Sequence, residues 1–101
     1  MRTPVSIGDG RATVTTSGTA VALTSSAQHV SAVTITALPT NTGLVWIGGP
    51  NVKAALGSQR GTPLSANDSF YIAVADLSQV YVDAATNGEG VTFTYTDNSF
   101  R

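Results

Sequence analysis

The chain has 101 residues, a length typical of a single domain. It contains no cysteine and one histidine, and only 11% of its residues are charged, against about 25% in an average protein. The lack of cysteine excludes disulfides and thiolate metal sites. The five basic residues are spread along the chain, so they predict no nucleic-acid partner.

The low charge predicts assembly. Thr and Ser make up about a quarter of the residues, and the formal net charge is -1. Little long-range repulsion therefore keeps copies apart, and the cores of protein interfaces are themselves poor in charged residues. We expect a homo-oligomer, a trimer or a dimer, and the alternative is a neutral monomer.

Residues 1–11 (MRTPVSIGDGR) predict an N-terminal arm, followed by a single domain at residues 12–101. Val5 and Ile7 alternate with Ser6, so the arm could add a strand to a partner and order only on assembly. The arm has no apolar segment of the kind found in secretory signals. The apolar runs of the chain are too short to cross a bilayer, so we expect synthesis in the cytoplasm and no membrane partner.

The first half of the domain predicts short strands. Ala12–Thr16 and Thr19–Thr24 flank Ser17-Gly18, which is typical of a hairpin. Two further candidates follow, Val30–Leu38, rich in β-branched residues, and Leu44–Ile47, apolar on both faces as in a covered strand.

The second half begins with a long irregular segment, Gly48–Pro63, in which Lys53–Leu56 could form one helical turn. Three strands with alternating apolar residues come next: Ser69–Ala75, Ser78–Ala84 and Val91–Thr96. Seven or eight short strands separated by turns predict an all-β fold, an antiparallel β-sandwich or jelly roll.

No group of residues predicts catalysis, a metal site or a cofactor. His29 has no neighbouring nucleophile and acid that would complete a triad, and it is best interpreted as a loop residue. None of the six acids lies within four residues of another, so they fit turns better than a calcium site. The Gly-rich runs lack the Lys-Ser/Thr pair of a phosphate-binding loop. We therefore expect no enzyme.

The aromatic residues are the candidate contact residues. Trp46, Tyr71 and Tyr81 could pack in the core, anchor a protein interface or together form a platform for a sugar. Phe100 lies beside the last residue, where an apolar ring would fray unless it docked on a neighbour. With Val5 and Ile7, these residues form the predicted interface.

Three long motifs carry a resemblance that spans Gly18–Thr96. They are GTAVALTSSAQHVSAVTITALPTNTGLVWIGG, GTPLSANDSFYI and LSQVYVDAATNGEGVTFTY. In their order and their turn patterns they resemble small phage virion proteins of the capsid decoration (cement) type or of the head or tail fibre type.

This resemblance implies a β-sandwich or jelly-roll fold, assembly as trimers or dimers, and a place on the capsid surface of a virion. The implied partner is the major capsid protein, which a decoration protein stabilises from outside. The resemblance implies no catalytic residues. Two other roles remain open: a fibre or receptor-binding domain for a host-surface glycan, and a neck or tail component.

Overall fold

The computed structural model describes the backbone of residues 5–98 and the side chains of residues 7–96. It confirms an all-β fold. The elements are β1 (Val5–Thr13), β2 (Val21–Ala22), β3 (Ala32–Ala37), β4 (Val45–Gly48), β5 (Thr62–Leu64), β6 (Ser69–Ala73), the 3-10 turn η1 (Leu77–Gln79), β7 (Tyr81–Ala84) and β8 (Gly90–Asn98). Within these residues, no helix has the length and hydropathy needed to span a membrane.

The strands form two four-stranded antiparallel sheets that pack face to face. Sheet A has the order β1-β8-β3-β6, and sheet B has the order β2-β7-β4-β5. The antiparallel pairs are nested, because β1 pairs with β8, β2 with β7, β3 with β6 and β4 with β5. This is the chain path of a jelly roll, a long hairpin rolled so that its nested strand pairs fall alternately in sheet A and sheet B.

Alternation along the strands builds the core between the sheets. Val33 and Ile35 of β3 and Phe93 of β8 are all at most 3% exposed, as the alternating pattern predicts. Sheet B contributes Val45, Ile47 and Val82, and Leu77 of η1 belongs to the same cluster. Ile72 is only partly buried and packs against this cluster.

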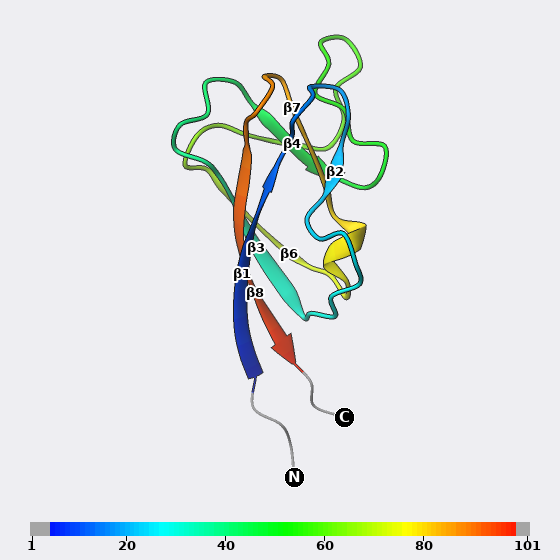
Figure 1. Ribbon diagram of the computed structural model, residues 1–101, viewed down its shortest axis with the longest axis vertical. Coiled ribbons are helices and arrows are strands. Elements are labelled where there is room, and N and C mark those ends of the chain that lie inside the picture. The colour runs from blue at the N-terminus through cyan, green and yellow to red at the C-terminus, as the bar shows by residue number, and fades with distance from the viewer. Residues whose placement is uncertain (1–4, 99–101) are drawn as a thin grey trace.

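The β1 and β8 strands form a ribbon that projects from the sandwich (Figure 1). They pair from Val5 opposite Asn98 to Thr13 opposite Gly90, whereas β3 reaches only as far as Ala32, opposite Thr96. The ribbon contributes to a long envelope of 50 × 24 × 18 Å. The segment expected to be a free arm therefore has a partner within its own chain.

Two glycines of β1 make room for aromatic rings. A Cβ atom built on Gly10 would lie 2.6 Å from Cζ of Phe93, and one on Gly8 would lie 2.5 Å from Cζ of Tyr95. Each ring thus covers the backbone of the glycine opposite it, which compensates for the poor strand propensity of glycine.

The predicted hairpin of Ala12–Thr16 and Thr19–Thr24 is wrong, because β1 and β2 belong to different sheets. The segment that follows β1 is hydrogen-bonded to the turn before β8, so it does not fold back along β1. Ser17 donates its N–H to Oδ1 of Asn87, and the N–H of Gly88 donates to the carbonyl of Val14. These partners lie far along the chain, so a local pattern could not reveal them.

Two other local predictions differ from the structure. Lys53–Leu56 forms no helical turn; Lys53 instead bridges to Arg60 across the loop that joins β4 to β5. The short strand β5 was not expected, because Thr62 and Pro63 were assigned to the irregular segment Gly48–Pro63. Proline has no N–H to donate, and it is tolerated there because β5 is an edge strand with no partner strand on its outer side.

The packing of Phe93 on Gly10 gives a first prediction. Gly10→Val should lower the free energy of unfolding by about 1–3 kcal/mol, because the new side chain must displace a ring that is 3% exposed. Urea unfolding followed by circular dichroism measures this loss. Thr13→Val is the matched control, since Thr13 is exposed on the same strand and should change stability by no more than about 0.5 kcal/mol. Equal stability of the two variants would contradict the packing.

Candidate interaction surfaces

Over β3, β6 and β8, alternation gives the outer face of sheet A no charged side chain. At β1 the same face carries Asp9 and Arg11, opposite Thr94 and Thr92. Thr34 lies opposite Thr94 and Tyr71, and Thr36 lies opposite Thr92. We call the surface made by Thr34, Thr36, Tyr71, Thr92 and Thr94 the threonine face. Thr36 and Ser69 share a hydrogen bond of 2.8 Å between their hydroxyls. Tyr71 is 68% exposed, and a shallow hollow of about 200 Å³ lies beside it. Such a surface loses little solvation of charge when a partner covers it.

The structure does not bring the three aromatic candidates together. Phe70 and Ile72 pack against the core, so Tyr71 between them faces outward from sheet A. Trp46 and Tyr81 alternate with core residues of β4 and β7, so both face outward from sheet B, where they are partly buried. The outer faces of the two sheets point in opposite directions. The prediction of one sugar platform made from all three rings is therefore wrong.

Two other predicted interface residues, Val5 and Ile7, belong to β1 of the projecting ribbon. Ile7 is 76% exposed. Val5 begins β1, with its backbone opposite Asn98. Phe100 lies outside the residues that the structure describes. The predicted contact residues therefore mark two regions of sheet A, the ribbon and the threonine face, and one region of sheet B.

The outer face of sheet B is closed by loops that a buried carboxylate holds in place. Asp83 is 0% exposed although it points away from the core. Its Oδ1 accepts the N–H of Gly18 at 3.0 Å and that of Ala84 at 2.9 Å, and its Oδ2 accepts the N–H of Ala54 at 2.9 Å. The carboxylate thus ties the β1–β2 and β4–β5 loops to β7. In the sequence, a single acid within the apolar strand VYVDA indicates a buried carboxylate of this kind.

Glu89 fastens a second loop. Its carboxylate accepts the N–H of Thr42 at 2.6 Å, the hydroxyl of Thr42 at 2.9 Å and the N–H of Gly43 at 3.0 Å. Partial burial opposes ionisation, but these three donors outweigh it, so the pKa of Glu89 lies below its usual value. Glu89 is thus a structural acid that links the β3–β4 turn to the start of β8.

His29 lies near an acid and a hydroxyl without forming a catalytic triad. It bridges to Asp76 through the backbone. Asp76 caps η1 by accepting the N–H and the hydroxyl of Ser78, each at 2.9 Å, and it also accepts the N–H of Gln28 at 3.0 Å. The bonds from Ser78 and Gln28, with a smaller effect of His29, lower the pKa of Asp76. The hydroxyl of Ser78 donates to Asp76 rather than to His29. In a catalytic triad the hydroxyl instead bonds to the histidine, which in turn bonds to the acid.

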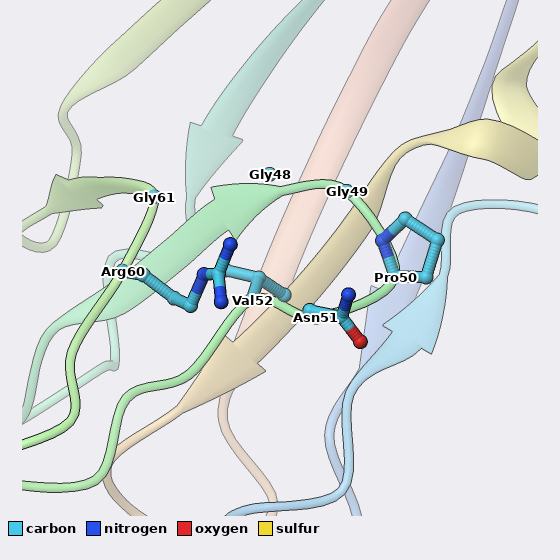
Figure 2. Close-up of a pocket in the computed structure, with 7 residues that line it drawn as sticks. All are labelled: Gly48, Gly49, Pro50, Asn51, Val52, Arg60 and Gly61. Carbon is cyan, nitrogen blue, oxygen red and sulfur yellow. The ribbon is translucent and has the colours of Figure 1, made fainter.

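Two hollows lie beside the loop between β4 and β5. Figure 2 shows the first, of about 370 Å³, between the turn Gly48–Asn51 and the segment Arg60-Gly61. Its lining holds one cation, Arg60, and one amide, Asn51, but no acid or nucleophile. The second, of about 390 Å³, opens between the sheets and is lined mainly by apolar side chains such as Phe70, Ile72 and Val80. Neither lining brings an acid and a base together.

Among the residues that the structure describes, His, Asp and Glu do not gather in threes in a way that could hold a metal ion. No family model, no curated protein and no solved structure matches the chain. The surfaces described above are therefore the basis for a proposal about function.

The loop anchor gives a second prediction. Asp83→Ala should lower the free energy of unfolding by about 3 kcal/mol, because it leaves the N–H groups of Gly18, Ala54 and Ala84 without their acceptor. Asp68→Ala is the control, since Asp68 is exposed and its carboxylate accepts within its own turn, from the N–H of Ser65. Chemical unfolding compares the two variants. An Asp83→Ala variant as stable as the control would show that the loops do not depend on this carboxylate.

The lowered pKa of Glu89 gives a third prediction. Its carboxylate stabilises the fold above the pKa of the unfolded chain, and this contribution is lost as the pH falls through the lower pKa of the folded state. Glu89→Gln should therefore be less stable than the wild type at pH 7, and the difference should shrink as the solution is acidified. Urea unfolding at a series of pH values tests this. A difference that is constant with pH would refute it.

Proposed function

We propose that this chain is a structural virion protein, a capsid decoration protein that binds the major capsid protein on the outer shell and stabilises it. The observation that carries the proposal is the neutral threonine face of sheet A, beside the projecting ribbon of β1 and β8. A shell protein must attach to large, repeated surfaces, and it needs broad contact rather than a deep pocket. The resemblance of the motifs to small phage virion proteins supports the same role.

The distribution of polar groups also supports a role in attachment. Asp76, Asp83 and Glu89 bind the backbone of their own chain, so they do not present free carboxylates to a substrate. The threonine face presents hydroxyl groups and one exposed ring, Tyr71. Hydroxyl groups can both donate and accept hydrogen bonds, and many weak contacts add up when a protein is held at several points.

The role of a glycan-binding fibre domain has weaker support. It rested on Trp46, Tyr71 and Tyr81 acting together, and the two sheets separate Tyr71 from the other two. Trp46 and Tyr81 are both partly buried, so neither offers the open ring face on which a sugar would stack. We therefore favour attachment to a protein shell.

A binding experiment with capsids tests the proposal. Shells assembled from the major capsid protein of the phage that encodes the chain should bind the purified protein and melt at a higher temperature with it than without it. Thr34→Arg should reduce binding at least tenfold, because it places a long charged side chain at the centre of the threonine face, where Thr94 and Tyr71 are its cross-strand neighbours. The copies bound per shell are measured by sedimentation, and shell melting by calorimetry.

Leu56→Arg is the matched control for this experiment. Leu56 is 92% exposed on the loop that joins two strands of sheet B, so the variant adds the same charge away from the threonine face. It should bind like the wild type. Wild-type protein that neither binds nor stabilises the shells would overturn the proposed function. Equal binding of both variants would overturn the assignment of the threonine face.

A further inference from the structure

The outer edge of β1 has free backbone groups. β1 is at the edge of sheet A and pairs only with β8. On the other side of β8, Gly90 and Thr96 give their carbonyls to Leu38 and Ser31. Alternate residues of an antiparallel strand point their N–H and C=O groups to opposite sides. In β8 the even-numbered residues therefore direct their backbone groups to β3, and the odd-numbered residues direct theirs to β1. Each odd-numbered residue of β8 lies opposite an even-numbered residue of β1. The odd-numbered residues of β1 direct their N–H and C=O groups outward.

The outward residues of β1 include two opposite charges. Asp9 and Arg11 are both exposed, and they alternate with the inward-facing Gly8, Gly10 and Ala12. They lie two residues apart, so they share one face of the strand. A run of like charges on an edge strand would repel a second copy, and natural edges use charge in that way. One acid and one base on either side of Gly10 instead attract a second copy, because a two-fold rotation about Gly10 places the acid of each copy beside the base of the other.

We propose that two copies of the chain dimerise by pairing their β1 edges antiparallel, with Gly10 opposite Gly10. In this register Asp9 of each copy lies opposite Arg11 of the other. The outward N–H and C=O groups of both residues then bond across the interface, as do those of Ile7 and Thr13. The two sheets A join into one continuous sheet, which gives the closed two-fold symmetry most common among homo-oligomers.

Charge selects this register over its neighbours. Only the odd-numbered residues of β1 have free backbone groups at the outer edge. The pairing register of the two β1 strands can therefore shift only by steps that keep odd-numbered residues opposite each other. One such step in one direction places Asp9 opposite Asp9, and one step in the other places Arg11 opposite Arg11. Like charges directly opposite each other destabilise a strand pair. The register centred on Gly10 is therefore favoured.

The shape of the molecule leaves room for this contact. The ribbon of β1 and β8 projects from the sandwich (Figure 1), and Ile7 near its end is 76% exposed. Gly10 lies opposite Phe93, where β8 also pairs with β3 at Ile35, so the bodies of the two copies lie side by side across the shared edge. This inference deepens the proposed function, on which it rests for its biological use, by naming the edge that joins two copies.

Charge exchange tests the proposal on the purified chain, with no shell present. Analytical ultracentrifugation over a dilution series should show a dimer for the wild type. Asp9→Arg and Arg11→Asp should each weaken dimerisation at least tenfold, because each variant places like charges opposite each other. An equimolar mixture of the two variants should form dimers again, since each then supplies the charge that the other lacks. Circular dichroism confirms that both variants are folded.

Lys53→Asp is the control for Arg11→Asp, since it makes the same change of charge on the exposed loop before β5 and should leave the dimer intact. Three results would each overturn the proposal: a wild-type chain that is monomeric at every concentration, a trimer, or a dimer that the β1 variants do not weaken. Failure of the variant mixture to dimerise would overturn the register. Shell binding by a monomeric wild type would leave the proposed function standing without this interface.

Discussion

The strand β8 holds sheet A together. It lies between β1 and β3 and pairs with both along most of its length, so the sheet is incomplete until the last part of the chain has folded. Gly90 begins the strand, where a side chain would overlap the carbonyl of Ala12. Phe93 then supplies a large ring to the core and covers Gly10 at the same time. The projecting ribbon, the threonine face and the free edge all depend on this strand.

Several carboxylates of the chain hold its loops in place by accepting backbone N–H groups. Three carboxylates, those of Asp76, Asp83 and Glu89, each accept backbone N–H groups from segments distant in sequence. A small sandwich with short strands must satisfy many N–H groups in its connections, and a carboxylate can accept several at once. A chain with only 11% charged residues uses several of its acids in this way. What remains on the outer face of sheet A over β3, β6 and β8 is uncharged, which suits contact with protein.

The fold could be predicted from the sequence because alternation is local. Val33 and Ile35 alternate with threonines along the strand, and successive side chains of a strand point to opposite faces. Both apolar residues therefore face the core. The pairing of strands could not be predicted, since β1 and β8 meet from opposite ends of the chain. The same limit explains the wrong hairpin after Ala12 and the wrong grouping of the three aromatic rings. The candidate residues were found by type, but the sheet on which each lies depended on strand order, which no local pattern encodes.

Hydrogen exchange at single amides of β1 tests the central claim that this edge is free in the chain and covered on assembly. At high dilution, the amides of Gly8, Gly10 and Ala12 should exchange slowly, because they face β8, whereas those of Asp9 and Arg11 should exchange rapidly. At concentrations where copies associate, the amides of Asp9 and Arg11 should become protected. Protection of these two amides at high dilution, or rapid exchange under every condition, would contradict the account.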